Sequence, residues 1–179
     1  MNRLLALPVL VLIFFSCKKE SDNIIWQRSF GEGNAMCVLA APDSGIIACG
    51  EISNHPYLLK LTKKKSTDFS FTSSAEGSFS SAWACDSCIV CTGSSAGALL
   101  ISRIDPDGIM DWDTAINSEA GFEIGNSALI MSGSTLVAIG SSDPDFTGVE
   151  SSGLLFVKFD TTGNVILKSE ISETDLVSA

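Results

Sequence analysis

Short apolar stretches that end on glycine recur along the chain, separated by polar and turn-forming residues. Residues 46–50, 89–93 and 136–140 read IIACG, IVCTG and LVAIG. Each is apolar and rich in β-branched residues, and each is too short and too often interrupted by Gly or Ser to be a helix. The pattern predicts β-strands throughout, joined by turns such as DPDG and DTTG, whose Asp, Pro and Gly residues favour chain reversal.

The apolar pattern repeats with a basic period of 43 residues. Three features recur: an aromatic residue, a strand-ending glycine, and a basic residue within a strand. They are Trp26, Phe69 and Trp112; Gly50, Gly93 and Gly140; and Lys60, Arg103 and Lys158. The third unit is longer because the loop at 141–153 replaces a short turn at 94–97.

Each unit is expected to contain four strands, which in the first unit lie near 36–41, 45–50, 57–61 and 68–72. Four short strands in roughly 40–50 residues match the blade period of a β-propeller. We predict an all-β repeat domain with three four-stranded antiparallel propeller-blade-like repeats. The domain is expected to span residues 24–179, with repeats at about 30–72, 73–115 and 116–171 and a stub at 172–179.

Three repeats are fewer than the roughly four to eight blades that close a propeller. A truncated product of a longer gene is the favoured explanation, because the stub at 172–179 aligns with the start of a fourth unit. Two copies that associate edge to edge towards a six-bladed ring, or an open array of three sheets, are the alternatives. Exposed blade edges would invite self-association in either case.

The chain begins with an apolar run that predicts an export signal. Residues 4–15 are all apolar, and Ser16 separates them from Cys17. A membrane-spanning helix needs roughly 20 apolar residues, so the run indicates a signal peptide over residues 1–16 instead. A cysteine at the cleavage position resembles a bacterial lipoprotein signal, which implies acylation of Cys17 and a lipidated tether over residues 17–23. An ordinary secretory signal followed by an unrelated cysteine is the alternative.

Short motifs within the units resemble a known repeat. They are WQRSFGEG, DSGIIACGE and YLLKL in the first unit and LLFVKFDTTGNVI in the third. Together they are similar to a degenerate β-propeller-like repeat of exported Bacteroidetes proteins, and the SCKKE after the signal resembles lipoproteins of these bacteria. The resemblance implies a palmitate-bearing Cys17 and a place in the cell envelope. The outer membrane is the expected site, with the domain facing either the periplasm or the surface. It implies no catalytic residue.

Acidic residues concentrate in the second half of the chain. Residues 17–104 carry eight basic and eight acidic side chains, whereas residues 105–179 carry two basic and thirteen acidic ones, and the whole chain has a net charge of −10. A surface of this sign repels phosphate backbones, which argues against nucleic acid as a partner. The one basic cluster, Lys63–Lys65, falls in a predicted turn, where solvated charges are expected.

Side chains suited to catalysis or metal binding are sparse. The chain has one histidine, His55, and lacks nucleophile-elbow, phosphate-loop and two-histidine metal motifs. We therefore expect neither an enzyme nor a cofactor. The loop with Asp143, Asp145 and Glu150 offers three carboxylates, which calcium prefers, but without the spacing of an EF-hand. A solvated acidic loop is the default there, with a weak calcium site as the alternative.

The recurring aromatic residues are expected to pack between blades, but Trp83 falls outside that series. By the repeat period it matches Ala40 and Ile130 on the first strand of each unit. The innermost strand of a blade lines the propeller channel, where an aromatic ring could stack on a sugar or peptide. Core packing of Trp83 is the alternative.

Three cysteines stand at the spacing C-x2-C-x2-C in WACDSCIVCTG. Read alone, this resembles the start of a ferredoxin loop, but no fourth ligand follows. The repeat alignment sets the stretch over AAPDSGIIACG and places Cys85 and Cys88 at the positions of Pro42 and Gly45, on either side of a turn. A hairpin without a metal therefore accounts for the motif.

The cysteine count after the lipidation site is odd, so at least one thiol is left over in an oxidising compartment. Cys37 and Cys49 lie on the two strands of the first hairpin and are expected nearly opposite each other. We predict Cys37–Cys49 and Cys85–Cys88 as disulfide candidates, and Cys91 as a free or packed thiol.

These patterns predict a membrane-anchored, non-enzymatic binding or scaffolding module of β-repeats. Its expected partners are the lipid bilayer, through Cys17, and a second copy of the chain. The alternative is an enzyme, or a glycan- or peptide-binding propeller, whose site is completed by missing blades or by a second subunit.

Overall fold

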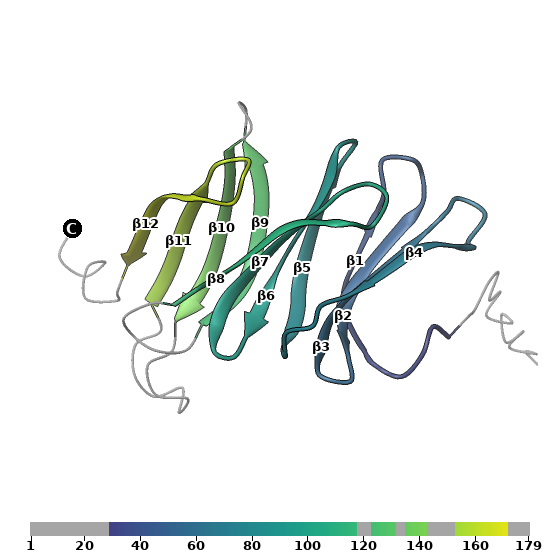
Figure 1. The fold of residues 1–179 in the computed structure, drawn as a ribbon, viewed down its shortest axis with the longest axis horizontal. Coiled ribbons are helices and arrows are strands. Elements are labelled where there is room, and N and C mark those ends of the chain that lie inside the picture. Colours follow the sequence, from purple (N-terminus) through teal and green to yellow (C-terminus); the bar gives the residue numbers. More distant parts are fainter. Residues whose placement is uncertain (1–28, 118–122, 132–134, 143–152, 172–179) are drawn as a thin grey trace, which may run out of the picture. The chain divides into compact units, whose positions relative to one another are not determined.

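The computed structural model describes residues 29–117, 123–131, 135–142 and 153–171. The chain divides into two units, Met1–Phe30 and Gly31–Ala179, and all elements below belong to the second. Every regular element in the described ranges is a β-strand (Figure 1). The strands are β1 (Asn34–Ala40), β2 (Ile46–Ile52), β3 (His55–Leu61), β4 (Thr67–Thr72), β5 (Ser78–Cys85), β6 (Cys88–Ser95), β7 (Ala98–Ile104), β8 (Met110–Ile116), β9 (Glu123–Met131), β10 (Thr135–Ser142), β11 (Gly153–Phe159) and β12 (Val165–Ile171). These ranges hold no helix long and apolar enough to cross a membrane.

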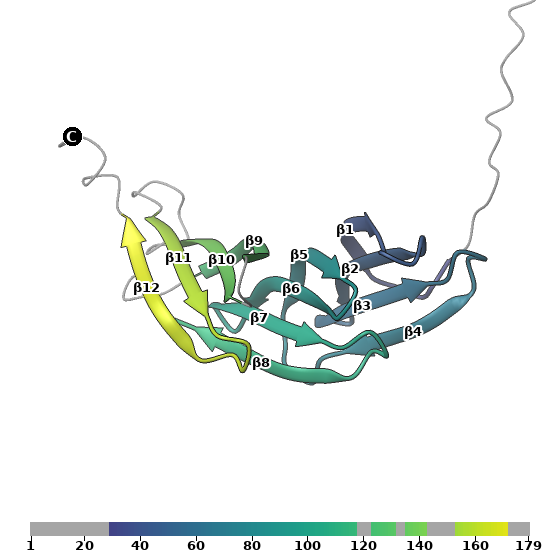
Figure 2. The ribbon, with the colours of Figure 1, turned by 90° about the horizontal axis from the view of Figure 1, so that it is seen from above.

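The strands form three antiparallel sheets, each a meander in chain order. β1–β4 make the first sheet, β5–β8 the second and β9–β12 the third. β5 packs on β1, β2 and β3, and β9 packs on β5, β6 and β7, so the second sheet lies between the other two (Figure 2). The sequence prediction of three four-stranded, blade-like sheets is confirmed, and the sheets do not close into a ring.

The repeat is visible in the irregularities of the sheets. In each sheet the pairing between the last two strands shifts just after the basic residue, between Lys60 and Leu61 in the first, Arg103 and Ile104 in the second, and Lys158 and Phe159 in the third. Such a bulge leaves one extra residue on the last strand. That residue is Asp68, Asp111 and Ile166 in turn.

The strand register places the basic residue in the same row of side chains in every sheet. Each row runs across all four strands of a sheet. From the first strand to the last, it holds an aliphatic or aromatic residue, a branched aliphatic residue, the basic residue, and an aromatic residue or leucine. The rows are Leu39, Ile47, Lys60 and Phe69; Trp83, Val90, Arg103 and Trp112; and Leu129, Val137, Lys158 and Leu167. We call these the first, second and third basic rows.

Two apolar cores lie between the sheets. Successive side chains of a strand point to opposite faces, so the second sheet supplies both. On β6, Ile89 and Cys91 join the core against the first sheet, whereas Cys88 and Val90 join the core against the third. This double burial explains why Cys88–Cys91 of this strand reads as a continuous apolar run rather than an alternating one.

The strand register differs from the 43-residue sequence alignment on β5, the first strand of the second sheet. Ala84 pairs with Ile89 as Ala40 pairs with Ile46, so the turn from β5 to β6 is one residue shorter than its counterpart. Trp83 is therefore equivalent to Leu39 and Leu129 in the basic rows, not to Ala40 and Ile130 as the period suggested. A sequence period cannot locate a one-residue deletion inside a turn.

Candidate functional site

The basic residue of the first row is nearly buried and neutralised by two carboxylates. Lys60 Nζ lies 2.9 Å from Asp43 Oδ2 and 2.9 Å from Asp68 Oδ2, and only 11% of the lysine side chain is exposed. Asp43 comes from the β1–β2 turn, where its Oδ1 accepts the Gly45 N–H, and Asp68 is the bulge residue of β4. The Phe69 ring lies beside the ammonium, with its centroid 5.8 Å from Nζ.

The pKa values follow from this arrangement. Hydrogen bonding to Lys60 lowers the pKa of Asp43 below its ordinary value. Burial by itself lowers the pKa of Lys60, but its hydrogen bonds to Asp68 and Asp43 outweigh burial and leave that pKa raised. Lys60 and Asp43 are thus both charged near neutral pH.

A cavity of about 300 Å³ adjoins this ion-pair group, between the first two sheets. Apolar and charged side chains line it together: Pro42, Asp43, Ile47, Lys60, Cys85, Asp86, Ile89 and Pro106. A smaller cavity, described below, lies between the second and third sheets. The two cavities correspond, because Lys60 of the first basic row lines one and Arg103 of the second basic row lines the other.

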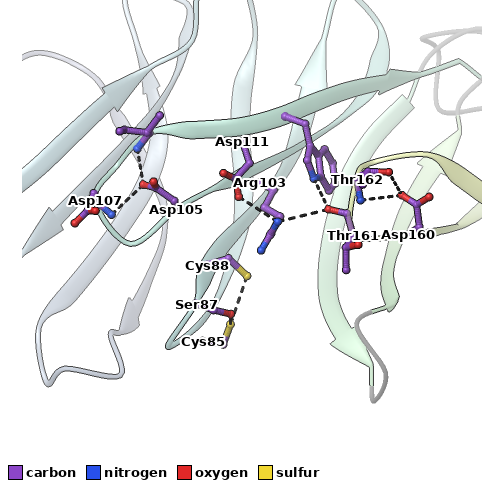
Figure 3. A network of polar contacts seen from close by, with 12 residues as sticks. Cys85, Ser87, Cys88, Arg103, Asp105, Asp107, Asp111, Asp160, Thr161 and Thr162 are labelled. Atoms are coloured by element: carbon purple, nitrogen blue, oxygen red, sulfur yellow. Dashed lines mark hydrogen bonds and ion pairs between the residues drawn. The ribbon is translucent and has the colours of Figure 1, made fainter.

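At the second interface, the basic row reaches the third sheet through hydrogen bonds. Arg103 Nη1 lies 3.1 Å from Asp111 Oδ2 and 3.5 Å from the Thr161 carbonyl oxygen, which also accepts the Trp112 Nε1–H at 3.0 Å (Figure 3). The Trp112 ring stacks on Phe159 with centroids 6.2 Å apart. Trp112 therefore packs between blades as predicted.

The first interface has a matching aromatic contact. Phe69 packs against the core between the first two sheets. A side chain at Gly108 would meet its ring, as one at Gly163 would meet Trp112. Trp26, the remaining member of the aromatic series, lies outside the described residues.

Two cysteines face each other beside Arg103. Cys85 ends β5 and Cys88 begins β6, and their Sγ atoms lie 3.4 Å apart across the Asp86–Ser87 turn (Figure 3). The Ser87 hydroxyl lies 3.3 Å from Cys85 Sγ. A cavity of about 120 Å³ opens here, lined by Cys85, Ser87, Cys88, Arg103, Trp112, Leu136, Asp160 and Thr161.

The two thiols have opposite environments. Burial alone raises the pKa of Cys85, but hydrogen bonds with Ser87 and Cys88 outweigh it and lower that pKa below its ordinary value. Burial dominates at Cys88 and raises its pKa, although the Arg103 guanidinium works in the other direction. Cys85 is half-buried, whereas Cys88 is 1% exposed. The accessible thiol is therefore the more acidic one.

The remaining cysteines, Cys37, Cys49 and Cys91, form a second group, the internal group, in which Cys49 and Cys91 are buried and Cys37 is half-buried. Cys37 stands directly opposite Cys49 in the β1–β2 register, as predicted. Cys91 of the second sheet lies fully buried near both, and burial raises its pKa well above the ordinary value. The five cysteines in the described ranges are free thiols, so both disulfide assignments stay predictions.

The other predicted site residues divide into two sets. Trp83 is half-buried and lines neither of the two cavities, so a ligand role for it stays a prediction. Asp143, Asp145 and Glu150, the weak calcium candidates, lie outside the described residues, as does Cys17. In the ranges that the structure does describe, no cluster of three potential metal ligands occurs.

The sequence prediction recognised the recurring basic residues only as markers of the repeat and did not assign them a role. A signal was present: a charged residue inside an apolar strand, with an aspartate 17 residues before Lys60 and before Arg103 and another eight residues after each.

A scan against models of known protein families finds none that matches this chain, and a search of curated proteins finds no significant match.

Proposed function

We propose that this protein is a lipid-anchored component of the cell envelope, placed at the outer membrane through Cys17. Support comes from the N-terminal sequence: an apolar run of residues 4–15 that is too short to span a bilayer, followed by Ser16 and Cys17. Two or more acyl chains on one residue would give stable anchoring, which a single chain does not. Residues 17–23 would serve as a polar tether to the repeat domain.

The anchoring proposal has a direct test. Expressed in a bacterium with a lipoprotein pathway, the mature chain should begin at an acylated Cys17 and partition into detergent with the membranes. A Cys17→Ser variant should lose both properties while keeping its β-sheet circular dichroism spectrum. A Cys17→Ser variant that still fractionates with membranes would refute lipid anchoring.

The repeat domain acts, in this proposal, as a non-enzymatic binding or scaffolding module. The observation that carries it is the outward face of the third sheet, which bears the third basic row. In the first two sheets the corresponding faces are covered by the next sheet. Here Leu129, Met131, Leu154 and Leu167 are 45%, 49%, 44% and 50% exposed. Exposed apolar groups gathered on one face mark an interaction surface.

A second copy of this chain is the partner that best fits that face. Val38, on the outward face of the first sheet, is 70% exposed, and its register equivalents Ala82 and Ala128 face the preceding sheet. The outward faces of the first and third sheets thus correspond to the two sides of one inter-sheet interface. Head-to-tail contact between copies would repeat that interface, as a heterologous association.

Light scattering on size-exclusion fractions tests this assignment. Wild-type protein should show a mass that rises above that of the monomer with concentration. Leu154→Arg should abolish the rise, because it places a charge in the outward face. Ile109→Arg is the matched control, since Ile109 is 66% exposed in the turn between β7 and β8 and lies off that face. A wild-type protein that stays monomeric at all concentrations, or a control that behaves like Leu154→Arg, would count against self-association.

An enzyme, or a glycan- or peptide-binding propeller completed by further blades or a second subunit, is the second candidate. The cavity of about 300 Å³ beside Lys60 favours it, because it combines apolar walls with charged groups. A thermal-shift panel of glycans, peptides and calcium tests it on the associated form. Stabilisation that Lys60→Met abolishes would support this candidate, and no stabilisation by any compound would argue against it.

A further inference from the structure

The turn that carries Cys85 and Cys88 brings a half-buried thiol and a buried thiol together. The β5–β6 register pairs the two residues directly, and their sulfurs are 3.4 Å apart. A disulfide bond is about 2.05 Å long, so closure needs the sulfurs to approach by only roughly 1.4 Å. In the first sheet the corresponding turn is one residue longer and has Gly45 in place of Cys88.

The pair is asymmetric in access. Cys85 lines both cavities described above, one on each side of the second sheet, and is half-buried. Cys88 is almost completely buried, with 1% of its surface exposed, and it lines only the smaller cavity. Thiol–disulfide exchange begins when an accessible thiolate attacks a disulfide, and an adjacent second thiol can then resolve the mixed disulfide.

We propose that Cys85 and Cys88 form a redox-active dithiol that exchanges with external disulfides. The Cys85 thiolate attacks one sulfur of a disulfide R–S–S–R, which forms a mixed disulfide and releases the first thiolate RS⁻. Cys88 then loses its proton and attacks the Cys85 sulfur, which closes the Cys85–Cys88 bond and releases the second RS⁻. The dithiol gives up two electrons and two protons, and the external disulfide is reduced to two thiols.

Three neighbours support particular steps. Ser87 lies 3.3 Å from Cys85 Sγ and stabilises its thiolate, consistent with the lowered pKa of Cys85. Arg103 favours deprotonation of Cys88 when the mixed disulfide is resolved. The cavity of about 120 Å³ next to Cys85 offers room for one arm of a small disulfide. Arg103 is a positioning residue here, because it acts through Cys88.

The internal cysteine group provides the contrast. Burial raises the pKa of Cys49 to about 12, and Cys91 is fully buried. Thiols of high pKa in a dry core exchange slowly, because the thiolate is the reactive species. Exchange is therefore assigned to the Cys85–Cys88 pair rather than to Cys49 or Cys91.

The first experiment equilibrates the purified protein with defined ratios of reduced and oxidised glutathione, then alkylates it and determines its mass. Two alkylatable thiols should disappear together as the ratio becomes oxidising and should return in excess reduced glutathione. Cys88→Ser should instead accumulate one glutathione on Cys85. Cys85→Ser should do neither, and Cys91→Ala should behave like wild type.

The proposal is overturned if the pair stays oxidised in excess reduced glutathione, which marks a static disulfide, or if both thiols stay alkylatable at every ratio. It is also overturned if Cys88 in the Cys85→Ser variant takes up glutathione as readily as Cys85 does in the Cys88→Ser variant. Circular dichroism on each variant shows that it is folded.

A second arm distinguishes small disulfides from protein disulfides. The reduced protein is mixed with glutathione disulfide or with insulin, and loss of its free thiols is followed over time. The cavity predicts reaction at least tenfold faster with glutathione disulfide per disulfide bond, and faster reaction with insulin would reject the cavity as the entry site. Arg103→Met should slow resolution of the mixed disulfide several-fold and Arg103→Lys should restore it. Equal rates in the two variants would remove the role of Arg103.

Discussion

Lys60 offers a test of how the basic rows are stabilised, because removing the lysine and removing its partners should have very different effects. In Lys60→Met the apolar side chain keeps its place between Ile47 and Phe69, and Asp43 and Asp68 return to water. Their side chains are already 51% and 38% exposed. Exposed ion pairs contribute about 0.2–1 kcal/mol each and a cation–π contact about 0.5–1 kcal/mol, while the cost of burying the ammonium is removed. The net change in the free energy of unfolding should lie within about 1 kcal/mol.

The double variant Asp43→Asn, Asp68→Asn leaves the nearly buried ammonium without a counter-charge. Breaking a buried pair in this way costs about 3–5 kcal/mol, and the remaining amide acceptors reduce the expected loss to about 2–4 kcal/mol. At a typical urea slope of about 2 kcal/mol per M, the unfolding midpoint should fall by about 1–2 M. Urea titration followed by tryptophan fluorescence measures both variants. A Lys60→Met variant that is less stable than the double variant would refute the argument.

The stability of the wild type and that of the Asp43→Asn, Asp68→Asn double variant should also respond oppositely to alkaline pH. In the wild type the pKa of Lys60 is raised, so its contribution is complete below the unfolded value of about 10.4 and is lost as pH rises through the folded pKa. The pKa of Asp43 is lowered, so its contribution is present above about 3.9 and is lost as pH falls through the folded pKa. In the double variant, burial depresses the pKa of Lys60, so the unfolded state binds more protons. Stability relative to wild type should then increase from pH 7 to pH 10.

Two further predictions concern the turn between β11 and β12. The Asp160 carboxylate accepts hydrogen bonds from Thr162 and Asn164, which lower its pKa to about 2. Carboxyl NMR should find Asp160 ionised at pH 3, and a titration midpoint near pH 4 would contradict this. The stability that the Asp160 carboxylate confers should be present above about pH 3.9 and be lost only as pH falls through about 2. Gly163→Ala combines a φ of +86° with a Cβ position 2.7 Å from the Trp112 ring and should lower stability by about 2 kcal/mol. Ala96→Gly is the contrasting control, since Ala96 has a φ of +49° and should gain up to about 1 kcal/mol in the same urea assay.

The fold could be predicted from the sequence because its signals are local and repeated. Short β-branched runs ending on Gly50, Gly93 and Gly140 fix the second strand of each sheet. The turns that follow the third strands, which begin with Asp in the second and third units, fix the reversals there. Repetition made each weak signal stronger, since one hairpin predicts the next. The one-residue shift at Trp83 was missed because deleting a turn residue changes the register of a strand without changing its composition.

The candidate site was harder to predict, because it depends on contacts between units. Sequence alignment placed Cys85 and Cys88 across a turn, and the structure agrees, since a short hairpin is a local feature. The approach of Arg103 and of the Thr161 carbonyl depends on how the second and third sheets pack, which no local pattern encodes. The same holds for Lys60, whose two carboxylates come from a turn and from a bulge on another strand.

A single shortened turn accounts for the difference between the first and second basic rows. In the first row the longer turn places Asp43 against Lys60, so both of the lysine's carboxylate partners come from its own sheet. In the second row, the equivalent residue Asp86 is exposed and forms no ion pair with Arg103. Among the described residues, Asp111 is then the one carboxylate paired with Arg103. The guanidinium, with donors in a fork that a lysine lacks, then reaches both Thr161 and Cys88. The same deletion sets Cys85 opposite Cys88, so the loss of a structural ion pair and the gain of a facing dithiol have one origin.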